Sequence, residues 1–251
     1  MLELSPLEFR FSLDDSSTFR ESFTVTNSGS EPLSVRFVAA PAPGLENPAY
    51  GALARWVSFS ESSVTLPPGA SQTISFSVAA PDSLPAGGQY AVLYAEALPE
   101  TSGEGIDLLS RVGLRLYASS SAEARRSVGF SSPELPSILV GAPLSTSLTV
   151  KNSGNLDFSV VTSFTITSPS GKQLYTDSVS TELLPESSKT VYQEWGDSPS
   201  FGLYRLNYTA QALDTSLSAS RLVFVFSPLS LVLLGLIFLS LVAALLFHRS
   251  R

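Results

Sequence analysis

Runs of alternating hydrophobic and polar residues recur along most of this chain, and one unbroken hydrophobic run replaces them near its C-terminus. Phe19–Thr26, Thr73–Val78 and Tyr204–Ala212 are examples of the alternating runs. Alternation puts every second side chain on the same side of an extended strand, so each run predicts a β-strand with one buried face. Turn sequences such as Asn27–Gly29 and Pro67–Gly69 separate the runs, because glycine accepts positive φ and proline presets φ. The pattern up to the hydrophobic run predicts an all-β protein.

The sequence also repeats itself. Thr24–Gly29 returns as Thr149–Gly154, and Pro68–Ile74 is answered by Pro185–Val191. Three further residues recur at the same spacing, namely Gly88, Tyr90 and Tyr94 as Gly202, Tyr204 and Tyr208. Matches that keep their order predict one β-rich module built twice, and the density of short strands is typical of immunoglobulin-like sandwiches. We therefore predict two tandem immunoglobulin-like β-sandwich domains, 1–119 and 128–227, joined by a small polar linker at 120–127.

The hydrophobic run, Leu229–Phe247, contains no charged residue. A helix of that length spans about 28 Å, close to the ~30 Å hydrocarbon core of a bilayer. We therefore predict one C-terminal transmembrane helix over 228–248, with the lipid bilayer as a partner through 229–247. The basic residues Arg249 and Arg251 end the chain, so the positive-inside rule predicts that 249–251 form a cytoplasmic tail.

The predicted localisation is thus the cell membrane, single-pass, with the N-terminal domains extracytoplasmic and the C-terminus cytoplasmic. Met1–Pro6 contains neither a basic nor an apolar stretch, so this orientation predicts that a signal peptide belongs upstream or has been removed. The alternative is a tail-anchored protein whose domains lie in the cytoplasm.

Composition narrows the chemistry. The chain has no cysteine and one histidine, which excludes disulfide frameworks and cysteine-ligated metal or redox sites. The formal net charge is −7, and no cluster of Lys and Arg precedes the tail, so we expect no nucleic-acid partner. We expect no cofactor and no metal.

Catalysis is not expected either. His248 stands at the end of the hydrophobic run, where no nucleophile can use it as a base. Asp14-Asp15 is interpreted as a turn, and Glu96, Glu100 and Glu104 flank a hairpin loop at Pro99–Gly105. A carbohydrate-active enzyme built on Glu96 or Asp14 is the remote alternative.

Aromatic residues are the candidate ligand-binding groups. Tyr50 and Trp56 lie at or beside the proline-rich segment Pro41–Tyr50, which is interpreted as a loop. Tyr90 and Tyr94 share one face of a predicted strand. An exposed aromatic row would stack on sugar rings, whereas the alternative is that these side chains fill the sandwich core.

The order of these signals resembles the membrane-anchored partner proteins of the WxL surface system of Gram-positive bacteria. The residues that carry the resemblance are Trp56, Leu66–Gly69, Gly87-Gly88 and Tyr90 in the first module and Val150–Gly154, Pro185, Phe201–Tyr204 and the final helix in the second. The resemblance implies a peptidoglycan-binding domain, a host-binding domain and a membrane anchor, with no catalytic role.

From this resemblance we expect a cell-surface protein that binds cell-wall polymer or a partner surface protein, with the first module as the ligand reader. The alternative function is an assembly or chaperone-like protein, or a structural envelope protein, whose exposed strand edge pairs with another chain as pilus chaperones do.

Overall fold

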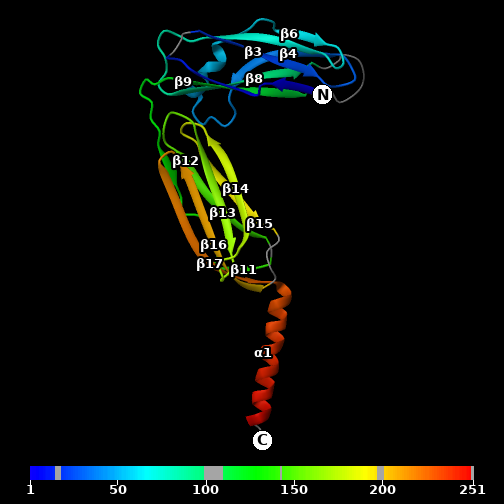
Figure 1. Cartoon of the computed structure of the whole chain (residues 1–251), viewed down its shortest axis with the longest axis vertical. Helices are drawn as coiled ribbons and strands as arrows, with labels where there is room; N and C mark the ends of the chain where they lie inside the picture. The colour runs from blue at the N-terminus through cyan, green and yellow to red at the C-terminus, as the bar shows by residue number, and fades with distance from the viewer. Residues whose placement is uncertain (15–17, 99–109, 142, 197–200, 250–251) are drawn as a thin grey trace. The chain divides into compact units, whose positions relative to one another are not determined.

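The computed structural model describes residues 1–14, 18–98, 110–141, 143–196 and 201–249. The predictions for Asp15 and for the Pro99–Gly105 loop with Glu100 and Glu104 lie outside these residues. The chain divides into two compact units, and each contains two β-sheets (Figure 1). The first unit comprises 1–127 together with two short segments, 152–157 and 184–187, and the second comprises 128–151, 158–183 and 188–251.

The first unit is a sandwich of a four-stranded sheet, ordered β1-β3-β7-β5, and a five-stranded sheet, ordered β2-β9-β8-β4-β6. All pairings are antiparallel except that of β2 with β9. The elements are β1 Leu2–Ser5, β2 Glu8–Ser12, β3 Thr18–Asn27, β4 Leu33–Pro41, the 3-10 helix η1 Pro48–Arg55, β5 Val57–Phe59, β6 Ser63–Leu66, β7 Ser71–Ala79, β8 Gly88–Ala97 and β9 Arg111–Ser119.

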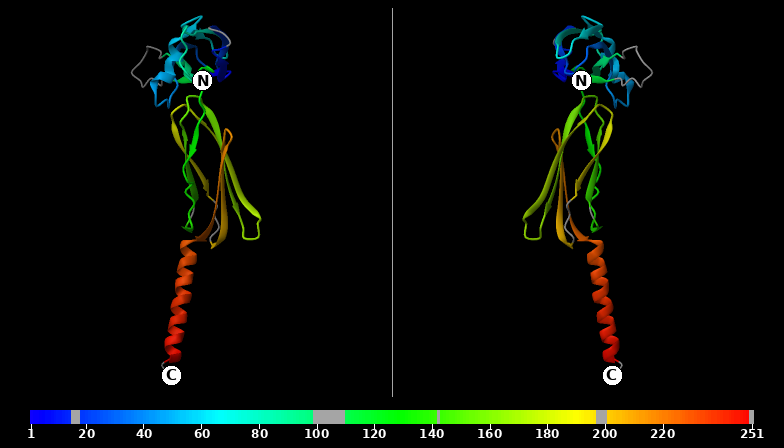
Figure 2. Two further views of the ribbon diagram at one scale, coloured as in Figure 1. Left: turned by 90° about the vertical axis from the view of Figure 1, so that its left-hand side faces the viewer. Right: turned by 90° about the vertical axis from the view of Figure 1, so that its right-hand side faces the viewer.

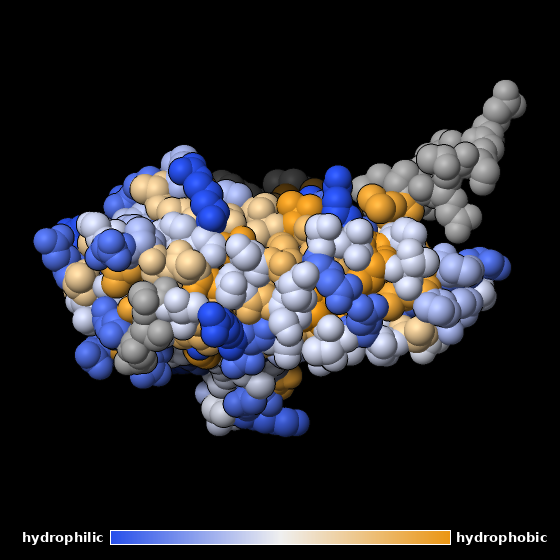
Figure 3. Space-filling model, turned by 90° about the horizontal axis from the view of Figure 1, so that it is seen from above, coloured by the Kyte–Doolittle hydropathy of each residue, from blue (hydrophilic) through white to orange (hydrophobic). Residues whose placement is uncertain are grey.

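Alternation along the strands fills the core of this unit. Phe23 and Val25 of β3, Ile74 of β7 and Leu93 of β8 are almost completely buried in one cluster. On the face visible in Figure 3, hydrophilic residues dominate the outline and hydrophobic residues are exposed between them, a mixture that is ordinary for a folded surface.

The second unit pairs a three-stranded sheet, β10-β12-β15, with a five-stranded sheet, β11-β17-β16-β13-β14. Seen from the side, the two sheets form separate layers (Figure 2). The strands are β10 Val128–Phe130, β11 Ile138–Val140, β12 Leu144–Asn152, β13 Phe158–Thr167, β14 Gln173–Leu183, β15 Ser188–Trp195, β16 Phe201–Ala212 and β17 Thr215–Phe226. Leu148, Phe164 and Tyr208 are among the side chains buried between the layers.

After Ser227 the chain forms one helix, α1, Pro228–Arg249. Its segment Pro228–Leu245 has a mean hydropathy of 2.6 and is not buried. Length and composition are therefore sufficient for a membrane span, but a single helix that meets these two criteria is weak evidence for one.

The prediction of two immunoglobulin-like sandwiches is confirmed, and several elements were missed. The proline-rich segment is not wholly a loop, because η1 begins at Pro48. Asn47 caps it, its Oδ1 accepting a hydrogen bond from Ala49 N at 3.0 Å, and a proline without an N–H fits the first helical position. The missed strands are β1, β10, β11 and β14. Of these, β14 consists largely of exposed or half-buried residues, so it carries little hydrophobic signal.

The repeated asparagine explains the repeated motif. Asn27 is 1% exposed, and its Nδ2 donates to Glu31 O at 2.8 Å and Leu66 O at 3.0 Å. Its Oδ1 accepts from Gly29 N at 3.0 Å. One amide group thus joins the turn after β3 to the end of β6.

Asn152 does the same in the second copy. It is fully buried, its Nδ2 donates to Leu156 O at 2.7 Å and Leu184 O at 3.0 Å, and its Oδ1 accepts from Gly154 N at 2.9 Å. The two motifs of each copy therefore meet in space through an asparagine. The interpretation of the motif as a turn and not a ligand site agrees with these contacts.

We predict that Asn27→Ala lowers the free energy of unfolding by about 2–4 kcal/mol, because several carbonyl groups lose their donor and each unsatisfied group costs about 1–3 kcal/mol. Urea denaturation followed by circular dichroism measures this. Asn27→Asp, which keeps the acceptor but loses the donor, should cost nearly as much. The neighbouring exposed Ser28→Ala is the control, and an equal cost for Ser28→Ala and Asn27→Ala would contradict the assignment.

Candidate functional site

All four predicted aromatic site residues belong to the first unit, and two of them are buried in it. Tyr90 is 1% exposed and Tyr50 is 8% exposed. They belong to one small cluster with Tyr117, and the rings of Tyr90 and Tyr117 meet edge to face with centroids 5.6 Å apart. The Tyr50 hydroxyl donates to Glu186 Oε1 at 3.0 Å.

Of the four residues, Tyr90 is the one whose hydroxyl makes two hydrogen bonds among the described residues. Its hydroxyl donates to Asp157 Oδ1 and accepts from Asp157 N, both at 2.9 Å. The other carboxylate oxygen of Asp157 accepts from Arg10 Nη1 at 2.7 Å, and the Arg10 guanidinium lies 3.9 Å from the centroid of the Tyr117 ring. Burial, followed by the charge of Asp157, raises the pKa of Tyr90 far above its ordinary value. These contacts stabilise the fold of the unit.

The glycine before each repeated tyrosine has a local reason. A Cβ on Gly88 would collide with the ring of Tyr90, and a Cβ on Gly202 would collide with that of Tyr204. The repeated Gly-x-Tyr spacing therefore lets each ring lie back over its own strand.

Trp56 and Tyr94 are half-buried. Trp56 packs against the hydrophobic core, and the Arg111 guanidinium covers the Tyr94 ring at 4.5 Å. The ligand-binding role of Tyr50, Trp56, Tyr90 and Tyr94 stays a prediction. Each of the four side chains has a packing contact within the unit. Tyr50 and Tyr90 are buried, so these two residues are not part of an exposed aromatic row.

The two described acidic candidates, Asp14 and Glu96, bond to other residues of the first unit. Asp14 Oδ2 accepts from Ser121 N at 2.7 Å and Oδ1 from Ser120 Oγ at 3.1 Å. The Ser121 hydrogen bonds hold the pKa of Asp14 below its ordinary value. Glu96 accepts from Arg36 at 2.8 Å. Among the described residues, no three His, Asp or Glu side chains form a group that could hold a metal ion.

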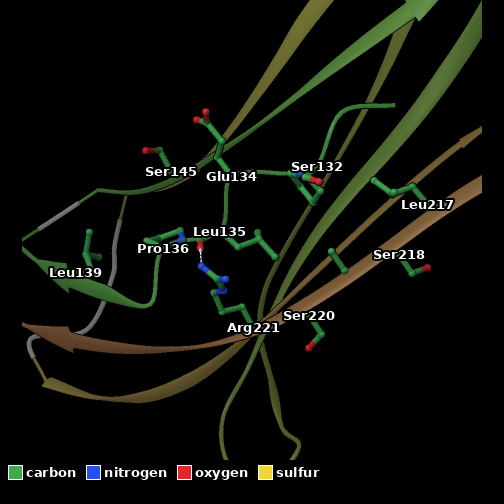
Figure 4. Close-up of a pocket in the computed structure, with 12 residues that line it drawn as sticks. Ser132, Glu134, Leu135, Pro136, Leu139, Ser145, Leu217, Ser218, Ser220 and Arg221 are labelled. Carbon is green, nitrogen blue, oxygen red and sulfur yellow. Dashed lines mark hydrogen bonds between the residues drawn. The ribbon is translucent and has the colours of Figure 1, made fainter. Parts of the chain in front are cut away.

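A groove lies in the second unit, at the open margin between its sheets. It has a volume of about 720 Å³. One wall is β17, with Leu217 and Ala219, and the other is the segment that leads from β10 into β11. The lining residues are Ser132, Pro133, Glu134, Leu135, Pro136, Leu139, Ser145 and Leu217–Arg221. In Figure 4 the Arg221 side chain reaches from β17 to the carbonyl oxygen of Leu135, which accepts from Nη1 at 2.9 Å.

The β17 strand leaves part of its backbone unpaired beside this groove. β16 pairs with all of β17 on one side, but β11 covers only Phe224–Phe226 on the other. Phe224 N donates to Ser137 O, and Phe226 O accepts from Gly141 N, so the even-numbered residues direct their backbone groups toward the β11 side. The N–H and C=O groups of Ser216, Ser218 and Ser220 therefore point outward, and they bond to no residue in the described part of the chain.

This stretch also lacks features that usually protect a sheet edge. Thr215–Ser220 contains no lysine, no proline and no charged residue, and its pairing with β16 has no bulge. We call Thr215–Ser220 with its outward backbone groups the open edge. Sequence reasoning missed it because the strand predicted there covered only Arg221–Phe226, whereas β17 begins at Thr215.

Comparison with known proteins gives structural matches only. No family model matches the chain, and no curated protein matches it. Among solved structures, the YadV chaperone has a TM-score of 0.47 at 14% identity, covering 87% of this chain and 99% of that one. The periplasmic chaperone SfaE has a TM-score of 0.42 at 11% identity, with 90% and 100% covered.

A further match is to the structure described as the Salmonella enterica SafA pilin in complex with the SafB chaperone. Its TM-score is 0.41 at 12% identity, and the match covers 89% of this chain and 96% of that one. At these TM-scores, the likeness alone assigns no function to this chain.

The resemblance to the WxL system is wrong. No family model matches the chain, and the matched structures named above are described as chaperones, one of them in complex with a pilin. The functions drawn from the resemblance, binding of peptidoglycan and a host-binding domain, are corrected with it. The prediction of a single-pass membrane protein with a lipid partner through 229–247 is also corrected, since one match is described as periplasmic and the helix alone is weak evidence.

We predict that Tyr90→Phe destabilises the first unit by about 1–3 kcal/mol, because the Asp157 N–H and carboxylate both lose a buried partner. Thermal denaturation by circular dichroism measures the change. Tyr94→Phe is the matched control on the same strand, since no hydrogen bond of its hydroxyl occurs among the described residues, and it should change stability by less than about 0.5 kcal/mol. Equal effects would contradict the role of the Tyr90 hydroxyl.

Proposed function

We propose that this chain is a non-catalytic assembly protein that takes up an extended strand of a partner protein along the open edge of β17. The observation that carries the proposal is the row of unpaired backbone groups at Ser216, Ser218 and Ser220, which borders a groove of about 720 Å³. The domain boundaries predicted from the sequence, 1–119, 120–127 and 128–227, remain predictions.

The backbone chemistry of the open edge favours a strand. Three residues present six hydrogen-bonding groups at the spacing of a β-ladder, and each bond contributes about 0.5–1.5 kcal/mol. Addition of a strand to an exposed sheet edge is a recurrent mode of peptide recognition in which main-chain bonds supply affinity and pockets for alternate side chains supply specificity.

The side chains beside the open edge indicate what the strand should contain. Leu217 and Ala219 are half-buried and pack against the core of the second unit. Leu135 and Leu139 line the same groove. Every second side chain of an incoming strand would face these apolar residues, so we propose a partner segment with small or apolar residues at alternate positions.

A selection from a phage-displayed library of random ten-residue peptides tests the proposal on the full chain, with mild detergent covering the exposed apolar helix. We expect the selected peptides to alternate apolar and polar residues. Ser218→Pro should reduce their affinity at least tenfold, because proline removes an outward N–H and its ring blocks the edge.

The matched control is Ser220→Ala, which removes a hydroxyl that donates to Asn207 Oδ1 at 3.0 Å but keeps the backbone edge. It should bind the peptides as the unchanged protein does. Circular dichroism checks that Ser218→Pro is folded, which we expect because proline is tolerated on a free edge. Peptides without alternation, or equal binding by folded Ser218→Pro, would contradict the proposal.

A further inference from the structure

An unpaired sheet edge can pair with a strand of another chain, so native proteins cover such edges or protect them with charged residues, proline or bulges. The open edge of β17 has no lysine, proline or bulge. We infer that, when no partner strand is bound, β17 pairs antiparallel with β17 of a second copy of this chain, in a register centred on Ser218. This inference rests on the proposed function, because it concerns the same edge.

The register follows from which residues direct their backbone outward. With Ser218 opposite the second copy's Ser218, Ser216 lies opposite the second copy's Ser220, and Ser220 lies opposite the second copy's Ser216. Facing residues whose backbone groups point toward each other exchange two hydrogen bonds. Three such pairs give six bonds, which use all the unpaired groups of Ser216, Ser218 and Ser220 in both copies.

The side chains of this register are compatible. The outward side chains that meet across the two copies are serines, which are small and uncharged. Arg221 faces the second copy's Thr215, so no like charges are opposed. The second copy's Asp214 lies one position from Arg221, and symmetry repeats this favourable placement of opposite charges.

The ends of the paired stretch also fit. β11 begins to cover β17 at Phe224, and the second copy's strand ends at its turn, opposite Leu222. The second copy's strand therefore stops where β11 starts.

An exposed apolar patch adjoins that end. Ile138 and Leu222 are 66% and 49% exposed. Leu213, at the turn between β16 and β17, is 37% exposed. The register brings the second copy's Leu213 next to Ile138 and Leu222, and symmetry repeats the contact at the other end.

The consequence is competition. A second copy and a partner strand require the same backbone groups, so binding of one excludes the other. The self-pairing buries three residues of edge and a small apolar contact on each copy, so it is a weak cover that a better-matched strand replaces.

Cysteine cross-linking of the full chain in mild detergent tests the inference, because the chain contains no cysteine of its own. Facing hydrogen-bonded residues have Cα atoms about 5.5 Å apart, within the range of a disulfide. Under glutathione redox buffer, Ser218→Cys should form a disulfide dimer at least tenfold faster than Ser170→Cys, which lies at an exposed turn. Ser216→Cys and Ser220→Cys should each link slowly alone and rapidly when mixed.

Equal rates for Ser218→Cys and Ser170→Cys, or rapid linking of Ser216→Cys alone, would overturn the inference. A peptide selected on the unchanged protein should slow the Ser218→Cys reaction, and an unchanged rate at saturating peptide would also count against it. The two proposals fail separately. Selected peptides without self-linking leave the proposed function intact, whereas self-linking without peptide binding removes the function and keeps the dimer.

Discussion

Buried backbone N–H and C=O groups must find partners, and the side-chain amides of Asn27 and Asn152 provide hydrogen bonds to such groups beside the strand turns. Each amide is buried and bonds to backbone groups from two segments that are distant in sequence. Because an unpaired buried carbonyl costs more than a typical hydrogen bond contributes, these two residues fix how the strand turns close on one another. The rest of each sandwich depends on that closure.

The need of backbone groups for hydrogen-bond partners also explains why the open edge should bind a strand. Elsewhere in the five-stranded sheet of the second unit, β13 pairs with β14 and β16, and β16 pairs with all of β17. At Ser216, Ser218 and Ser220 the sheet ends, although the strand is regular and the adjoining groove is partly apolar. A regular edge that is ready for a strand differs from a frayed one, because no conformational change is needed before pairing. A protein strand is the partner that matches it, whether from another protein or from a second copy.

Much of the fold followed from the sequence, and the site did not. The duplicated Thr-Val-x-Asn-Ser-Gly motif and the alternating runs predicted two sandwiches, because period-two patterning reports burial directly. It did not report the open edge, since the predicted strand began at Arg221 and the pattern of a strand does not tell which strands are its neighbours. The sequence also could not tell which tyrosine hydroxyls are hydrogen-bonded within the fold. Tyr90 has a hydroxyl that suits a binding surface, yet Asp157, far along the chain, satisfies it internally. The resemblance to WxL proteins rested on turn motifs that stabilise sandwiches generally, so it carried no information about the ligand.

Amide hydrogen exchange along β17, followed by nuclear magnetic resonance on protein dilute enough to be monomeric, tests the open edge most directly. The account predicts alternation, with fast exchange at Ser216, Ser218 and Ser220 and slow exchange at Leu217, Ala219 and Arg221, because only the second set bonds to β16. Raising the protein concentration should then protect the first set. Uniform protection of all six amides in the monomer would show that the edge is already covered, and it would contradict the account.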